Sequence, residues 1–93
     1  MEVSKTNLND VKIIQPKIFE DNRGYFFESY KSTVFSKNNF PSDFLQDNEV
    51  KSKHGVLRGL HYQLKEPQGK LVRVVLGSII DVAVDIRLGS PTF

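Results

Sequence analysis

Two runs of β-branched residues limit what this chain can fold into more than any other feature. Lys70–Leu76 and Ile79–Ile86 are rich in valine and isoleucine, the residues that favour strands. The two residues between them, Gly77 and Ser78, are typical of a tight β-hairpin turn. The sequence therefore predicts an antiparallel hairpin over this stretch.

Shorter segments upstream extend this β pattern. The turn-forming stretch Glu20–Gly24 precedes an aromatic run, Tyr25–Tyr30, which reads as a strand. Ser32 or Thr33 can cap a short helix within Lys31–Asn39. Val11–Ile14 is a short apolar stretch that ends before Pro16, and Lys17–Phe19 can pair locally before the turn. Further expected strands are Phe44–Asn48 and Val56–Gln63. We therefore expect an all-β, mainly antiparallel fold in one domain spanning residues 1–93, a sandwich or barrel with one short helix.

Composition restricts the class of protein further. Ninety-three residues suit one domain with a modest core, and the formal charge of +2 with no Lys/Arg block argues against nucleic-acid binding. There is no cysteine, so disulfides and thiolate metal sites are excluded. No apolar run is long enough to span a bilayer, and the polar first residues do not look like a signal peptide. We expect a cytoplasmic protein without a membrane partner.

Arg58 and His61 lie three residues apart within an apolar run. An odd offset places them on opposite faces of a regular strand. A bulge at Gly59 would re-aim the residues that follow, or the long Arg58 side chain would reach round the strand end. His61 is either a general base, since imidazole exchanges protons near neutral pH, or a core histidine bonded to a backbone carbonyl.

Three further ionic residues fall on the strongest predicted strands. Lys70 follows a glycine at the start of a predicted strand. It is at least as consistent with an exposed lysine at a sheet edge as with a residue of a functional site. Asp81 and Asp85 share one face of an apolar strand, where carboxylates need partners. Either the two aspartates pair structurally with Arg87 and Arg73, which we expect for Asp85, or one of them helps to orient a catalytic group. The two histidines, His54 and His61, do not have the paired spacing of a metal site.

Several blocks in this order resemble the dTDP-4-dehydrorhamnose 3,5-epimerase family over nearly the whole chain. They are Phe19–Glu28, Gln46-Asp47-Asn48, Val56–Gln63, Gln68–Arg73, Asp81–Arg87 and Ser90–Phe93. The resemblance implies a jelly-roll, cupin-like β-barrel, here incomplete, and a homodimer with strand exchange. It implies no cofactor and no metal. The implied reaction inverts dTDP-4-dehydro-6-deoxy-D-glucose at C3 and C5 by proton abstraction next to the C4 ketone, on the way to dTDP-L-rhamnose.

The resemblance also implies residue roles. His61 is the base, Lys70 stabilises the enolate oxygen, and Asp81 lies in or beside the pocket. Arg58 binds the diphosphate, which suits a guanidinium fork. The residues implied to bind the rest of the substrate are Phe19, Arg23, Phe26, Glu28, Gln46 and Asn48, with Arg23, Phe26 and Glu28 coming from the neighbouring subunit.

The chain departs from the family pattern in two respects. Family members are about twice as long, and their His-orienting aspartate and proton-donating tyrosine lie in a second half that is not in this sequence. Val50 stands where a small polar residue is expected. We therefore expect the N-terminal half of an epimerase, inactive or weak by itself. The alternatives are a non-catalytic nucleotide-sugar-binding or assembly module and a purely structural half-barrel.

Overall fold

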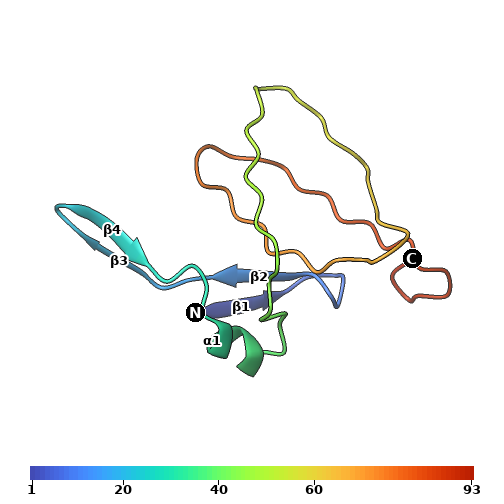
Figure 1. Cartoon of the computed structure of the whole chain (residues 1–93), viewed down its shortest axis with the longest axis horizontal. Coiled ribbons are helices and arrows are strands. Elements are labelled where there is room, and N and C mark those ends of the chain that lie inside the picture. The colour runs from blue at the N-terminus through green and yellow to red at the C-terminus, as the bar shows by residue number, and fades with distance from the viewer. The chain divides into compact units, whose positions relative to one another are not determined.

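A computed structural model describes all residues from Met1 to Phe93, and its regular elements are short antiparallel strands and one short helix. The elements are β1 (Glu2–Lys5), β2 (Lys12–Gln15), β3 (Ile18–Asp21), β4 (Gly24–Phe27) and α1 (Ser32–Lys37), as Figure 1 shows. No helix is long and apolar enough to cross a bilayer. The residues form two compact units, one of residues 1–31 with 74–93 and one of residues 32–73, and each is described by itself.

The first hairpin pairs β1 with β2, so that Val3 lies opposite Ile14. The loop between the strands is closed by the Thr6 hydroxyl, which lies 2.9 Å from the Leu8 carbonyl oxygen and 2.8 Å from that of Val11. The same hydroxyl accepts the Leu8 N–H at 3.1 Å. β1 is mostly polar and was not expected from the sequence. It forms because these bonds fold the chain back onto the apolar β2 segment.

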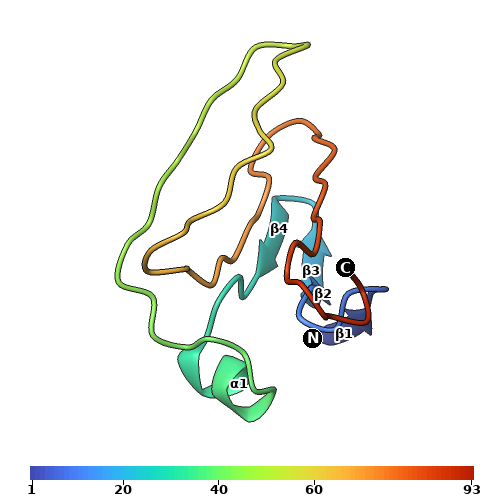
Figure 2. The ribbon, with the colours of Figure 1, turned by 90° about the vertical axis from the view of Figure 1, so that its right-hand side faces the viewer.

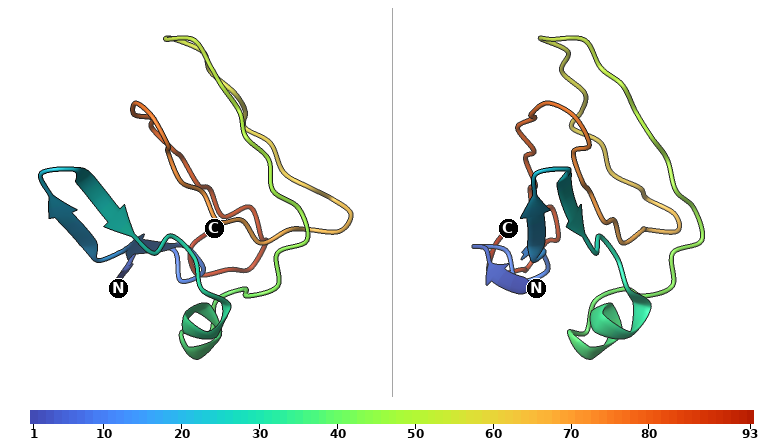
Figure 3. Two further views of the ribbon diagram at one scale, coloured as in Figure 1. Left: turned by 60° about the vertical axis from the view of Figure 1, so that its left-hand side comes forward. Right: turned by 90° about the vertical axis from the view of Figure 1, so that its left-hand side faces the viewer.

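The second hairpin joins β3 to β4 through the two residues Asn22 and Arg23, in the turn that the sequence predicts (Figure 3). Asp21 lies opposite Gly24 at the end of the ladder. Gly24 has a φ of 137°, which side-chain-bearing residues rarely adopt. The Asp21 carboxylate accepts the Arg23 N–H at 2.9 Å, and this bond fixes the turn.

Helix α1 lies within the predicted range and ends in a Schellman motif. Asn39 adopts a left-handed φ of 57°, and the Phe40 N–H donates to the Phe35 carbonyl oxygen at 2.9 Å. The Asn39 N–H donates to the Ser36 carbonyl oxygen at 3.1 Å. Phe35 is the buried core residue, 3% exposed, and its ring makes edge contacts with Phe40 at 5.7 Å and Phe44 at 6.4 Å between centroids. The helix therefore ends before Pro41, held by its own aromatic contacts.

The strands predicted downstream of the helix are not formed. The predictions at Phe44–Asn48, Val56–Gln63, Lys70–Leu76 and Ile79–Ile86 were wrong, because residues 40–93 contain no regular strand or helix (Figure 2). One face of Ile79–Ile86 would be wholly apolar in a strand, and such a face needs a covering layer. Here Leu76 and Ile80 are each 94% exposed, so the covering layers are missing. A lone hairpin of such residues is marginal in water.

The large solvent-accessible area of the chain shows that its core is small. The chain exposes 9480 Å², whereas a folded monomer of this mass exposes about 5,500 Å². The excess is larger than one partner's share of an obligate protein–protein interface, about 1,000–2,500 Å². The chain therefore presents the kind of surface that other proteins keep inside a shared core.

Candidate functional site

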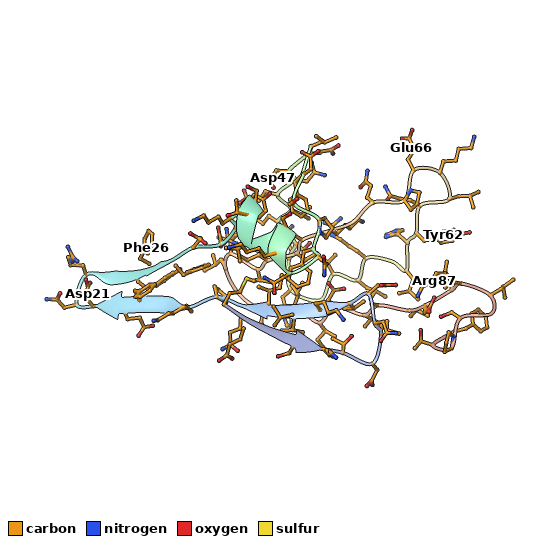
Figure 4. The ribbon with its side chains drawn as sticks, turned by 90° about the horizontal axis from the view of Figure 1, so that it is seen from below. Asp21, Phe26, Asp47, Tyr62, Glu66 and Arg87 are labelled. Atoms are coloured by element: carbon orange, nitrogen blue, oxygen red, sulfur yellow. The ribbon has the colours of Figure 1, made fainter.

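The β3–β4 hairpin brings together two of the predicted site residues. Phe19 and Phe26 are cross-strand partners, so their rings share one face of the hairpin, and they are 55% and 71% exposed. Figure 4 shows Phe26 standing clear of the ribbon, with Asp21 at the hairpin tip. The Lys17 Nζ lies 5.2 Å from the Phe19 ring centroid. The result is an exposed aromatic face with a cation at its edge.

Arg23 lies at the tip of the same hairpin and is already paired with a carboxylate. Its Nε donates to Asp21 Oδ2 at 3.2 Å, and its Nη2 donates to the same oxygen. The Arg23 guanidinium holds the pKa of Asp21 below its ordinary value, and Asp21 raises the pKa of Arg23. The Arg23 side chain is 86% exposed, so it stays accessible. Glu28 follows β4 directly and is exposed.

Arg58 is held differently, by a neutral group. The Val56 N–H donates to the Lys53 carbonyl oxygen at 3.3 Å, and Gly55 in this turn has a φ of 83°. Across the turn, the Arg58 Nε donates to the Ser52 Oγ at 3.0 Å. No ion pair is formed by Arg58, so its charge is uncompensated. Sequence analysis missed the Ser52 contact, although the glycine turn between the two residues was a signal for it.

Gly59 redirects the chain between Arg58 and His61. Its φ of 110° is one that side-chain-bearing residues rarely adopt. A Cβ at this position would lie 3.5 Å from the His61 backbone nitrogen and 3.7 Å from the His61 Nδ1. The bulge expected at Gly59 is not formed, because no strand surrounds it. That Arg58 and His61 serve one site stays a prediction.

Three further predicted positions lie in the same unit of residues 32–73. The Gln46 Nε2 donates to the Asn48 Oδ1 at 3.2 Å, so the two nucleotide-binding candidates point toward each other. Lys70 follows Gly69, whose backbone approaches Pro41 so closely that an added Cβ would lie 3.2 Å from the Pro41 Cγ. Lys70 itself is exposed. The glycine thus fixes the backbone from which Lys70 projects.

The two aspartates predicted on one strand face have different environments. The Asp85 side chain is 4% exposed and accepts hydrogen bonds from Arg87 Nε at 2.9 Å, Thr92 Oγ1 at 2.6 Å and Ser90 Oγ. Arg87 most strongly, then Ser90 and Thr92, hold the pKa of Asp85 far below its ordinary value. The structural pairing predicted for Asp85 is confirmed, whereas Asp81 is exposed.

Arg87 links this cluster to a distant part of the chain. Its Nη1 donates to Asp10 Oδ2 at 3.0 Å, and Asp85 and then Asp10 raise the pKa of the Arg87 guanidinium. Figure 4 labels Arg87 in this part of the molecule. Because one guanidinium bridges both carboxylates, the cluster ties residues 85–87 to Asp10. No group of three or more His, Cys, Asp or Glu side chains gathers as metal ligands would.

The predicted site residues divide between the two units. Residues 32–73 hold Gln46, Asn48, Arg58, His61 and Lys70, and the other unit holds Phe19, Arg23, Phe26, Glu28 and Asp81. Within a unit, the structure pairs Phe19 with Phe26 and Gln46 with Asn48. The remaining groupings stay predictions.

Comparison with known proteins gives one consistent family. The family model described as dTDP-4-dehydrorhamnose 3,5-epimerase matches residues 5–93. Similar proteins that carry this name come from Shigella flexneri, 57% identical over 96 residues, and Salmonella typhimurium, 55% identical over 95 residues. Each alignment covers 100% of this chain and 52% of the relative. A Methanothermobacter thermautotrophicus protein of the same name is 52% identical over 89 residues, covering 96% of this chain and 48% of its own length.

No solved structure matches the chain. The chain spans about half the length of the curated relatives named above. The family model nevertheless covers almost every residue, including all the predicted site positions. The chain belongs to the dTDP-4-dehydrorhamnose 3,5-epimerase family.

Proposed function

We propose that this chain supplies the base, the enolate-stabilising cation and the diphosphate-binding arginine of a dTDP-4-dehydrorhamnose 3,5-epimerase. The substrate is dTDP-4-dehydro-6-deoxy-D-glucose, which is inverted at C3 and C5. One observation carries the proposal beyond family membership. Arg58 has a fixed Nε and an uncompensated charge three residues before an exposed histidine.

The contrast among the arginines supports the role of Arg58. Arg23 and Arg87 both donate to aspartate side chains within the chain, so much of their charge is already balanced. Arg58 donates to a serine hydroxyl, which leaves the guanidinium its full charge. A guanidinium in that state is suited to an anion such as a diphosphate, which it binds through two parallel N–H donors.

We assign proton removal and enolate stabilisation to His61 and Lys70. His61 removes the proton from the carbon next to the C4 ketone, and the electron pair of that C–H bond passes to the ketone oxygen as an enolate. The Lys70 ammonium stabilises the charge that develops there. Reprotonation from the opposite face inverts the carbon and restores the ketone, so the reaction consumes no oxidant or cofactor. Asp81 is assigned to the edge of this pocket.

We assign binding of the nucleotide to the remaining site residues. The aromatic pair Phe19 and Phe26 offers a flat apolar surface, and Arg23 and Glu28 add polar groups on the same hairpin. Gln46 and Asn48 contribute amide groups. The jelly-roll barrel of cupin type and the strand-exchanged homodimer belong to this proposal. The exposed apolar side chains of residues 56–86 support both, because such segments become strands only when other layers cover them.

Deuterium exchange at the sugar C3 tests the proposal. We expect the chain in deuterated water to exchange the C3 proton slowly and to release little epimerised sugar. Exposed site residues leave the reacting carbon open to water, and the rate should stay far below ordinary turnovers of about 1–1000 per second. His61→Ala should abolish the exchange, whereas the matched variant His54→Ala, in the exposed loop, should retain it.

The outcomes separate the proposal from its alternative. Substrate binding without C3 exchange would contradict catalysis and favour a nucleotide-sugar-binding module. Exchange that survives in His61→Ala would remove His61 as the base. Epimerised product formed by this chain alone at an ordinary enzymatic rate would contradict the expected weakness of the isolated chain.

A further inference from the structure

We propose that Ser52 is a positioning residue for Arg58, and that its hydroxyl holds the Arg58 guanidinium ready for the diphosphate of a nucleotide sugar. This inference rests on the proposed function and adds a residue to it. Ser52 lies six positions before Arg58, in a loop that none of the expected site residues occupies.

The loop geometry makes the contact possible. The i to i+3 hydrogen bond from the Val56 N–H to the Lys53 carbonyl oxygen turns the chain back on itself. Gly55 supplies the positive φ of 83° that this turn requires. Ser52 precedes the turn and Arg58 follows it, which brings the Ser52 Oγ within 3.0 Å of the Arg58 Nε.

The contact leaves the correct part of the guanidinium available. A guanidinium carries five N–H donors, and Ser52 takes the single one on Nε. The four donors on Nη1 and Nη2 then form a fork whose direction is fixed by the Nε bond. A fork held in place loses less side-chain entropy when it binds an anion.

The neutrality of Ser52 matters as much as its position. Asp21 holds the Nε of Arg23 in a similar way but also balances its charge. A hydroxyl orients the guanidinium without reducing the attraction for phosphate oxygens. Lys51 and Lys53 flank Ser52 and add positive charge to the loop, with no acidic residue between Lys51 and Arg58. The positive charge of this loop therefore favours the binding of an anion.

Calorimetric titration with dTDP, and with thymidine as the probe that lacks a diphosphate, tests the inference. We expect Ser52→Ala to weaken dTDP binding about fivefold, the usual loss for one hydrogen bond, and to leave thymidine binding unchanged. Ser52→Thr, which keeps the hydroxyl, should restore the affinity to within about twofold. Ser52→Asp, which balances the charge, should weaken dTDP binding more than Ser52→Ala does.

A double-mutant comparison ties the effect to Arg58. Arg58→Ala should weaken dTDP binding about 10- to 100-fold, and adding Ser52→Ala to it should cause no further loss. Ser78→Ala, in another glycine-containing turn, serves as the matched control and should bind like the unaltered chain. Far-UV circular dichroism should be the same for all variants, because Ser52 and Arg58 are exposed.

Failure of the inference and failure of the proposed function give different results. If Arg58→Ala loses affinity but Ser52→Ala does not, or if Ser52→Ala weakens thymidine and dTDP binding equally, the positioning role is wrong and the proposed function stands. If the unaltered chain does not bind dTDP, or if Arg58→Ala binds it normally, the diphosphate role of Arg58 fails and the positioning role fails with it.

Discussion

The first forty residues and residues 56–86 differ in how well strand propensity predicts the structure that they adopt. The first region contains all five regular elements, although β1 is mostly polar. The second contains the densest runs of valine and isoleucine in the chain, yet it has no strand. Strand propensity therefore does not decide where strands form in this molecule.

The difference lies in local closure, that is, in contacts between residues close in sequence that hold a turn or a helix end. Thr6 closes the first hairpin, Asp21 closes the second, and a Schellman motif with aromatic contacts ends α1. Each contact joins residues within nine positions of one another. Ser78, in the turn expected between the two strongest runs, makes no such contact, and the apolar face of Ile79–Ile86 has no covering layer. In this chain a hairpin forms where a side-chain hydrogen bond holds its turn and where both faces of the hairpin can be exposed to water.

Phe35→Ala should break the closed region most severely. Phe35 is the buried core residue, and its removal eliminates the ring contacts with Phe40 and Phe44. We expect a loss of about 3–5 kcal/mol in the free energy of unfolding and the disappearance of the helical signal. Urea unfolding followed by circular dichroism measures both. Phe93→Ala, at a residue 69% exposed, is the control and should change stability by about 0.5 kcal/mol or less. Equal losses in the two variants would refute a core centred on Phe35.

Asp85→Asn should have a smaller effect, and it tests a local closure near the end of the chain. The amide keeps the shape of the side chain but loses the charge that Arg87, Ser90 and Thr92 bind. Because the folded-state pKa of Asp85 is depressed, its charge stabilises the fold above the ordinary value of 3.8. That contribution is lost as the pH falls below 3.8 toward the depressed value.

The urea midpoint of Asp85→Asn should therefore lie below that of the unaltered chain at neutral pH. The gap should stay constant down to about pH 4 and shrink at lower pH. Asp47→Asn, at an exposed carboxylate, is the matched control and should leave the midpoint almost unchanged. A gap that does not change with pH would mean that the Asp85 charge contributes nothing.

Sequence patterns identified the local features of the fold and missed those that depend on other layers. The helix within Lys31–Asn39, the turn at Glu20–Gly24 and the Asp85–Arg87 pair are confirmed, and each rests on residues close in sequence. The strands at Val56–Gln63 and Ile79–Ile86 were predicted from composition. Composition reports what a segment would bury and does not report whether a partner is present to bury it.

The site shows the same limit. The motifs identified His61, Arg58 and Lys70 as candidates, but the bulge expected at Gly59 is not formed, because the strand that would carry it is absent. The contact between Ser52 and Arg58 was not predicted, because it depends on a turn geometry that a list of residue types does not specify. The convergence of residues from the two units remains a prediction, since it requires tertiary packing.

Amide hydrogen exchange of the chain tests the central claim most directly, namely that local closure and not strand propensity determines its regular structure. We predict slower exchange for the hydrogen-bonded amides of β1–β4 and α1 than for the amides of Val56–Gln63 and Ile79–Ile86. Exchange in Val56–Gln63 and Ile79–Ile86 as slow as in β1–β4 would contradict the account, because it would mean that the apolar runs form stable strands without further covering layers.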